Sequence, residues 1–106
     1  MAYRWIIFKT EKKLFHCFCL PLVPVLNPDG YEYSRTTDRM WRKNRRKNSG
    51  SKCDGVDLNR NFEMGFGTAS SSNPCHEDFR GPEAFSEPES AALRDYVQGL
   101  TAGGVR

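Results

Sequence analysis

The residues of this 106-residue chain that are best suited to chemistry are Asn59 and Arg60, within the segment Asp57-Leu58-Asn59-Arg60-Asn61. They place an amide donor beside a guanidinium group. A guanidinium offers parallel N–H donors that match the two oxygens of a carboxylate. The segment therefore predicts recognition of an acidic group, such as the C-terminus of a peptide. Taken alone, the same five residues also fit a polar loop that follows a strand.

A cluster of basic residues lies upstream of this segment, in a chain whose net charge is +3. Tyr31, Tyr33 and Trp41 are close to the cluster in sequence, and Asp38 is the one acidic residue inside it. Basic and aromatic residues together are typical of nucleic-acid binding, so one hypothesis is a basic nucleic-acid-binding module. The alternative is a solvated surface loop that carries one functional arginine. The basic residues are Arg35, Arg39, Arg42, Lys43, Arg45, Arg46 and Lys47.

Two short strands are expected to position these residues. The apolar run Leu22–Leu26 predicts a buried strand, and the next four residues, Asn27-Pro28-Asp29-Gly30, predict a turn with proline and glycine in favourable positions. Residues 31–35 are then expected to be extended. A second strand, Gly55–Leu58, is expected to deliver Asn59 and Arg60 to a loop, and residues 62–82 are expected to be mostly coil.

One helix is predicted near the C-terminal end of the chain. Ser86 and Glu89 have the spacing of a capping box, and Pro88 is tolerated in a first helical turn. Gly103 and Gly104 are expected to end the helix. Four residues at helical spacing form an apolar stripe that needs a sheet to cover, namely Leu93, Tyr96, Val97 and Leu100.

Several segments, in their order and approximate spacing, resemble the zinc metallocarboxypeptidases of the carboxypeptidase A/B type. These segments are residues 27–31, 38–43, 55–62, 65–67 and 70–75, and the similarity extends from about Leu22 to Leu100. The resemblance implies an α/β fold, as a partial slice of the α/β/α carboxypeptidase architecture with its mixed sheet. In this chain the slice is expected to contain one or two short strands, long loops and one C-terminal helix.

The resemblance divides the chain into a leader without family counterpart (residues 1–21), a partial catalytic domain (residues 22–100) and a truncated tail (residues 101–106). The leader loosely imitates a signal peptide but has no small-x-small cleavage site, so it is interpreted as an alternative or wrongly assigned first exon. The family implies a secreted, extracellular protein, and no apolar run is long enough to span a membrane.

The resemblance also implies roles for individual residues. Asn59 and Arg60 match the family residues that bind the substrate carboxylate, and Arg42 matches the arginine that stabilises the oxyanion. Asp57 is expected to orient the loop or Arg60, and Asn61 to satisfy loop backbone groups. A disulfide between Cys53 and Cys75 is implied, which would contribute about 3 kcal/mol and indicates an oxidising compartment. Cys17 and Cys19 remain outside that bridge, as free or buried thiols rather than zinc ligands beside His16.

Zinc is the cofactor that the family implies, held there by a His-x-x-Glu pair and a later histidine. Neither His16 nor His76 begins such a pair, so the zinc ligands and the general base are expected to be absent from this chain. The leading hypothesis is a fragment of an enzyme that removes C-terminal residues from peptides and proteins, inactive as this chain alone. The alternatives are a non-catalytic binder of peptide C-termini or protein inhibitors, and the nucleic-acid-binding module.

Overall fold

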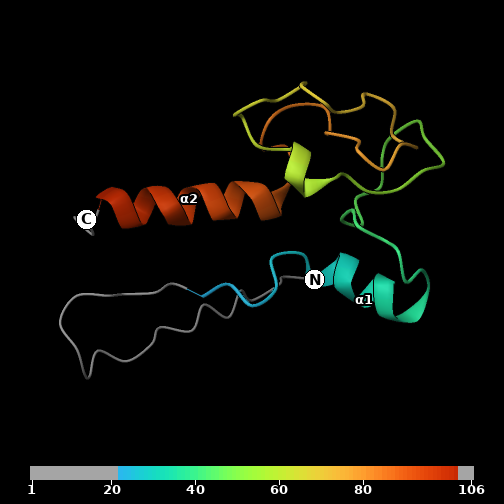
Figure 1. Ribbon diagram of the computed structural model, residues 1–106, viewed down its shortest axis with the longest axis horizontal. Helices are drawn as coiled ribbons and strands as arrows, with labels where there is room; N and C mark the ends of the chain where they lie inside the picture. Colours follow the sequence, from blue (N-terminus) through green and yellow to red (C-terminus); the bar gives the residue numbers. More distant parts are fainter. Residues whose placement is uncertain (1–21, 103–106) are drawn as a thin grey trace.

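The computed structural model describes residues 22–102. The predictions for the leader, for Cys17, Cys19 and His16, and for the glycines after the helix lie outside this range. Three helical elements are present in it: α1 (Pro28–Thr36), the 3-10 helix η1 (Leu58–Arg60) and α2 (Pro88–Ala102). Irregular chain connects them, and α2 projects away from the looped region that contains η1 (Figure 1). No helix among these residues is long and apolar enough to cross a membrane.

The two expected strands are not formed. Residues 22–26 are irregular, and Leu22, Val23 and Val25 are exposed. Residues 55–57 are also without strand structure, because their backbone groups find other partners. Val56 donates to the side-chain Oδ1 of Asn44 at 2.8 Å, and Asp57 donates to the carbonyl of Phe79 at 2.8 Å. A strand is stabilised by a paired neighbour, and within residues 22–102 the one isolated β-bridge, Ser71 with Phe79, does not extend into a ladder.

Residues 27–30 begin α1 instead of forming an isolated turn. Asn27 is the N-cap, and its side-chain Oδ1 accepts a hydrogen bond from the Gly30 amide at 3.0 Å, while Pro28 occupies the first helical position. Residues 31–35, expected to be extended, therefore continue a helix. The prediction was wrong because Asn-Pro favours both a turn and a helix start, and only the conformation of the later residues distinguishes the two.

The predicted C-terminal helix is confirmed as α2, with a different N-terminal arrangement. The Ser86 hydroxyl donates to the Glu87 carboxylate at 2.7 Å, and the Glu89 carboxylate accepts from the Asn44 side chain at 3.3 Å. Neither side chain of the expected capping box is used as predicted, and Glu89 instead ties the start of α2 to Asn44, which is distant in sequence. The apolar stripe of α2 is open, since Val97 is 51% exposed and Leu93, Tyr96 and Leu100 are half-buried.

The interior is small and unusually polar. Val56, Leu58 and Phe79 are its buried hydrophobic residues. Gly55 precedes them with a φ of +88°, and a Cβ there would lie 2.5 Å from the Asn44 carbonyl oxygen, so the close approach of these two segments requires glycine. The buried polar residues are Lys43, Asn44, Asp57, Asn61, Glu87, Glu89 and Ser90. Hydrogen bonds and ion pairs, rather than a large apolar core, hold the described loops in place.

Candidate functional site

Arg42 and Asp57 form the centre of the candidate site. The Arg42 Nη2 donates to Asp57 Oδ2 at 2.7 Å, and the Asp57 side chain is 3% exposed whereas that of Arg42 is 44% exposed. Asp57 is also the N-cap of η1, where its Oδ1 accepts from the Asn59 amide at 3.0 Å. One buried carboxylate therefore orients Arg42 and starts the helical turn that carries Asn59. Asp57 was expected to orient the loop or Arg60; it does orient the loop, as the N-cap of η1, but its ion-pair partner is Arg42 and not Arg60.

A cleft of about 730 Å³ brings two of the predicted site residues together. Arg42 and Asn59 both line it, with Asp57 between them. The remaining walls are largely apolar, formed by Leu26, Met40, Leu58, Phe62 and Leu93 together with Asn27 and Glu77. A mostly apolar cleft with a few convergent polar groups is the usual form of a ligand site.

Arg60 lies outside the set of residues that line this cleft. Its Nη1 is 3.4 Å from the Asn59 carbonyl oxygen. Its Nε is buried and has no hydrogen-bond partner among the described residues. A buried donor without a partner calls for an explanation. The structure therefore keeps Asn59 and Arg60 adjacent on η1 but does not direct Arg60 into the space that Arg42 and Asn59 share.

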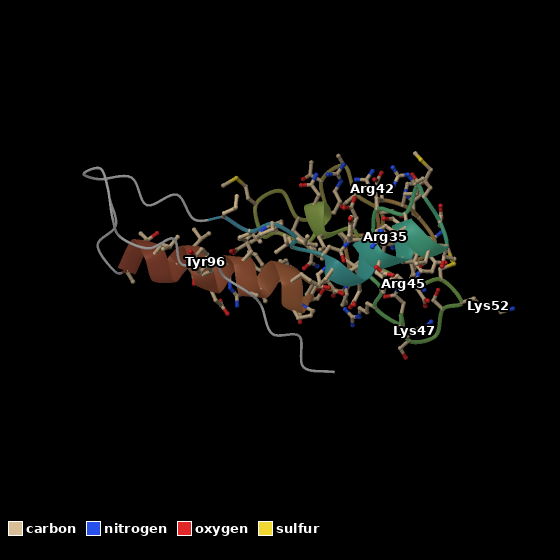
Figure 2. The ribbon with its side chains drawn as sticks, turned by 90° about the horizontal axis from the view of Figure 1, so that it is seen from below. Arg35, Arg42, Arg45, Lys47, Lys52 and Tyr96 are labelled. Atoms are coloured by element: carbon tan, nitrogen blue, oxygen red, sulfur yellow. A yellow bond between two sulfur atoms is a disulfide. The ribbon has the colours of Figure 1, made fainter. Side chains whose placement is uncertain are left out.

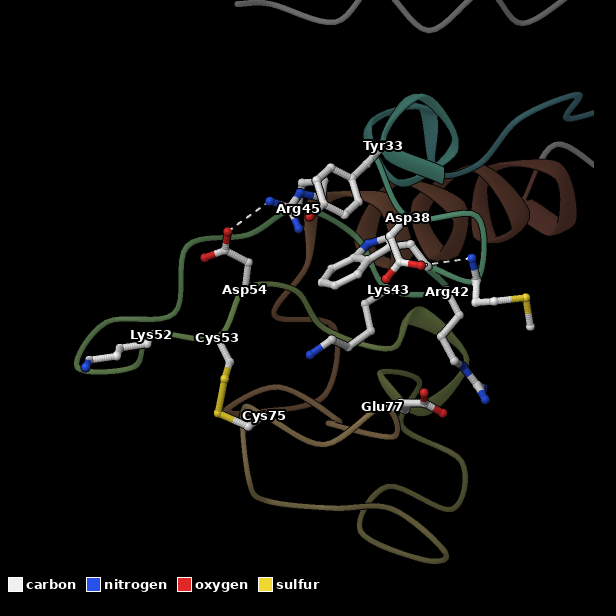
Figure 3. Close-up of a pocket in the computed structure, with 12 residues that line it drawn as sticks. Tyr33, Asp38, Arg42, Lys43, Arg45, Lys52, Cys53, Asp54, Cys75 and Glu77 are labelled. Carbon is white, nitrogen blue, oxygen red and sulfur yellow. Dashed lines mark hydrogen bonds and ion pairs between the residues drawn. A yellow bond between two sulfur atoms is a disulfide. The ribbon is translucent and has the colours of Figure 1, made fainter. Parts of the chain in front are cut away.

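The disulfide and Lys43 hold the loop that faces Arg42. Cys53 and Cys75 are bonded, with an S–S distance of 2.04 Å and a Cα–Cα distance of 5.0 Å, which confirms the predicted bridge. The Lys43 ammonium donates to the carbonyls of Pro74 at 2.9 Å and His76 at 3.3 Å, on either side of Cys75. Burial lowers the pKa of Lys43. Figure 3 shows Lys43 and the disulfide lining a second, smaller cleft of about 350 Å³.

The basic cluster is mostly paired within the molecule. Arg45 stacks over Tyr33, with Cζ 3.7 Å from the ring centroid, and its guanidinium is 3.0 Å from Asp54. A hydrogen bond from Lys47 lowers the pKa of Asp54. The interpretation as a solvated loop was thus wrong for Arg45, as it was for the buried Lys43. Figure 2 shows the labelled basic residues gathered at the end of the molecule opposite Tyr96.

A buried polar network behind the site was largely missed from the sequence. Asn61 is fully buried, and its side-chain Nδ2 contacts the Arg80 carbonyl at 2.9 Å and the Glu83 carbonyl at 3.1 Å. This confirms that Asn61 satisfies loop backbone groups. Its Oδ1 also accepts from the Glu87 amide and the Ser90 hydroxyl. Because these partners lie 19 to 29 residues away in the chain, local sequence patterns contain no signal for them.

The described residues do not fit a zinc site. They contain no group of three or more histidine, cysteine, aspartate or glutamate side chains that could hold a metal ion. Cys53 and Cys75 are consumed by the disulfide. His76 is exposed, and its Nδ1 accepts a hydrogen bond from the Asp78 amide at 3.2 Å. Chemistry that requires a metal is therefore not assigned to these residues.

The chain is similar to known carboxypeptidases in sequence and in structure. A family model described as zinc carboxypeptidase matches residues 5–104, a range that begins upstream of Leu22. Carboxypeptidase A2 from Rattus norvegicus is 51% identical over 78 residues, which cover 73% of this chain and 19% of that protein. An inactive metallocarboxypeptidase, ECM14, from Uncinocarpus reesii is 45% identical over 94 residues, covering 88% of this chain and 16% of that protein.

A structural likeness agrees with these sequence matches. The bovine thrombin-activatable fibrinolysis inhibitor, solved in complex with a tick carboxypeptidase inhibitor, matches with a TM-score of 0.70 and 43% identity, over 76% of this chain and 28% of that chain. The carboxypeptidase-type fold class is thus supported, although the described residues contain no strand of its mixed sheet. This chain spans less than a fifth of the length of the two relatives above. By the family-model match and these likenesses, the chain belongs to the zinc carboxypeptidase family.

Proposed function

We propose that this chain is part of a zinc carboxypeptidase that removes C-terminal residues from peptides and proteins. The observation that carries the proposal is the cleft in which Arg42, oriented by the buried Asp57, and Asn59 face the same space. A guanidinium that is already held in place can stabilise a developing oxyanion without reorganising during the reaction. Arg42 would serve in this role, since its side chain remains 44% exposed.

Asn59 and Arg60 would bind the terminal carboxylate of the substrate. Asn59 is exposed on η1, and the Nε of Arg60 has no partner among the described residues. Both side chains therefore keep donors that a carboxylate could satisfy. This assignment requires Arg60 to turn toward the cleft when a carboxylate binds, because it does not line the cleft in the structure.

Zinc in this family would polarise the scissile carbonyl and activate a water molecule. The described residues offer no set of ligands for it, so hydrolysis would depend on ligands outside residues 22–102. This chain alone is expected to lack carboxypeptidase activity and stoichiometric zinc. The disulfide supports a secreted protein, because such bonds persist in oxidising compartments.

A second candidate is a non-catalytic protein that binds peptide C-termini or protein inhibitors. It is favoured by the combination of available donors at Asn59 and Arg60 with described residues that do not fit zinc. The similarity of this chain to a relative named as an inactive metallocarboxypeptidase supports the same hypothesis. Nucleic-acid binding is supported less, because Arg45, Arg46 and Lys47 are paired with acidic residues and present less free positive charge to a phosphate backbone.

Binding of two matched peptides tests the carboxylate-binding role in the full chain. A peptide with a free C-terminus should bind at least about ten-fold more tightly than the same peptide with a C-terminal amide, because the charge-assisted hydrogen bonds are lost with the charge. Isothermal titration calorimetry provides the two dissociation constants. Equal affinity for both peptides would contradict the proposed function in either form.

A pair of arginine variants separates bidentate geometry from overall positive charge. In a complete enzyme that carries this segment, Arg60→Lys should lower kcat/KM by about ten- to a hundred-fold, since lysine keeps the charge but loses the bidentate fork. Arg35→Lys is the matched control, because Arg35 is exposed on α1 and contacts Glu32 at 3.5 Å. Arg45 is unsuitable as a control, since it stacks on Tyr33. Equal losses at both positions would mean that charge density alone matters.

A further inference from the structure

The carboxylate of Asp78 lies between Arg42 and His76. Its Oδ1 is 3.5 Å from the Nη1 of Arg42, and its Oδ2 is 3.9 Å from the Nδ1 of His76. The backbone amide of Asp78 also donates to the same Nδ1 at 3.2 Å. Each oxygen of one carboxylate thus faces a different side chain, one always cationic and one that can become cationic.

The two carboxylates that contact Arg42 are not equivalent. Asp57 is 3% exposed and holds Nη2 at 2.7 Å, whereas Asp78 is 33% exposed and faces Nη1 at the longer distance of 3.5 Å. The contact with Asp57 is a short hydrogen bond to a buried carboxylate, so it is the stronger of the two contacts that hold the guanidinium. Asp78 makes a longer and more exposed contact with the other guanidinium nitrogen, so this contact is the easier of the two to break.

Protonation of His76 would offer the Asp78 carboxylate a second charged partner. Histidine is the side chain whose charge ordinarily changes between pH 5 and 8. In the structure Nδ1 is an acceptor, since it receives the Asp78 amide hydrogen. A proton on Nδ1 removes that acceptor and creates a charged donor 3.9 Å from Asp78 Oδ2. His76 is 57% exposed, so water can replace the lost partner of the amide.

We propose that Asp78 is a positioning residue for Arg42, and that protonation of His76 draws Asp78 toward the imidazole and frees the Nη1 of Arg42. At neutral pH the guanidinium is shared by two carboxylates. At acidic pH only Asp57 remains bound, and Nη1 becomes available to an oxygen atom in the cleft. The consequence for catalysis rests on the proposed role of Arg42, but the coupling between the three side chains does not.

Other charged groups surround this unit and determine the controls. The Lys43 ammonium contacts the His76 carbonyl at 3.3 Å, and Asp57 lies on the far side of Arg42. Glu77 is exposed, lines both clefts and has no ion pair among the described residues. Beyond them, Asp54 and Arg45 act on Lys43 through their charges. Because Glu77 adjoins His76 in the chain and is exposed, it provides the comparison variant.

The test follows the Arg42 guanidinium by nuclear magnetic resonance in the full chain, between pH 5 and 8. Its ¹³Cζ resonance is assigned by its disappearance in Arg42→Lys. The expected result is a single step in that resonance, with the same midpoint as the His76 ring resonances. Glu77→Gln should retain the step. Absence of a step in the unmodified chain would overturn the proposal.

Two variants remove the coupling from opposite sides. His76→Asn keeps a side-chain oxygen that can accept the Asp78 amide, as Asn73 Oδ1 accepts the Cys75 amide at 3.0 Å in the same loop. Asp78→Asn keeps the backbone hydrogen bond and removes the carboxylate. Both should abolish the Arg42 step, and in Asp78→Asn the His76 resonances should still titrate. Persistence of the step in either folded variant would overturn the proposal, so one variant suffices if the other does not fold.

The nuclear magnetic resonance test of the coupling and the peptide-binding test of the proposed function have independent outcomes. Loss of the coupling would leave the discrimination between free and amidated C-termini unchanged. Conversely, equal binding of the two peptides would remove the proposed function while the Arg42 step remained. The two ideas can therefore fail separately.

Discussion

Arg42 donates through Nη2 to Asp57 Oδ2 across 2.7 Å, from a side chain that is about half exposed to a carboxylate that is almost completely buried. This difference in exposure between the two side chains matters for the site. A buried acid holds Nη2 of the guanidinium in place, and Arg42 lines the cleft. Since Asp57 also accepts from the Asn59 amide, it couples the stability of η1 to the orientation of Arg42.

Asp57→Asn should destabilise the chain by about 2 kcal/mol. The variant retains an oxygen for the Asn59 amide but places an uncharged amide against a guanidinium, and a hydrogen bond to a charged group contributes about 1.5–3 kcal/mol. Urea denaturation followed by circular dichroism measures the difference. Asp95→Asn is the control, since Asp95 is 65% exposed and its ion pair is with the adjacent Arg94, and exposed pairs contribute little. Equal effects would mean that burial of Asp57 is unimportant.

Asn61→Ala should lower the stability of the chain, whereas Asn59→Ala should weaken carboxylate binding. Asn61 is fully buried, and its removal takes away the partner of the Arg80 carbonyl and of the Glu87 amide, so the free energy of unfolding should fall by about 2–4 kcal/mol. Asn59 is exposed and its side chain should matter for carboxylate binding rather than for stability. Denaturant titration and peptide binding, measured on both variants, distinguish the roles. A stability loss at Asn59 as large as that at Asn61 would contradict this division.

Cys53 and Cys75 should be recovered as one linked pair by non-reducing peptide mapping, with Cys17 and Cys19 outside that bridge. Replacing both bridged cysteines by serine should lower stability by about 3 kcal/mol, because the bond closes a loop with a sequence separation of 22 residues. The double variant Cys17→Ser, Cys19→Ser is the control and should keep the Cys53–Cys75 peptide. Recovery of Cys53 linked to Cys17 or Cys19 would be incompatible with the structure.

Glu89 should make the chain less stable as the pH rises above the acidic range. Burial raises the pKa of Glu89 in the folded chain, and hydrogen bonds from its own backbone amide and the Asn44 side chain oppose the shift. A raised folded pKa means that the folded chain binds the proton more tightly than the unfolded chain. The stabilisation is therefore complete below the unfolded pKa and is lost as the pH rises through the folded pKa.

Glu89→Gln removes this dependence and keeps an oxygen for Asn44. The variant should gain stability relative to the unmodified chain at pH 7, and the gain should shrink toward pH 4. Urea titrations of both proteins at these two pH values provide the comparison. A stability difference that is the same at both pH values would show that burial does not penalise the Glu89 carboxylate.

Local patterns in the sequence were sufficient for α2, and the order of several motifs was sufficient for the family, whose resemblance in turn implied the Cys53–Cys75 bridge. An apolar residue every three to four positions after a proline-containing first turn specifies a helix within about fifteen residues of chain. Residue chemistry singled out Asn59 and the resemblance to a family singled out Arg42, and both line the cleft. Local patterns failed at Asn27, where a turn and a helix N-cap begin with the same residues.

Only the tertiary structure decided how the side chains are paired. Arg45 is held against Tyr33 and Asp54, and Asn61 joins α2 to the loops before it, although no spacing in the sequence distinguishes these residues from solvated neighbours. Residues 22–26 have the composition of a strand, but a strand forms only where a second strand supplies hydrogen-bond partners. Residue types and local periodicity are properties of the chain itself, whereas burial and pairing depend on which distant segments meet.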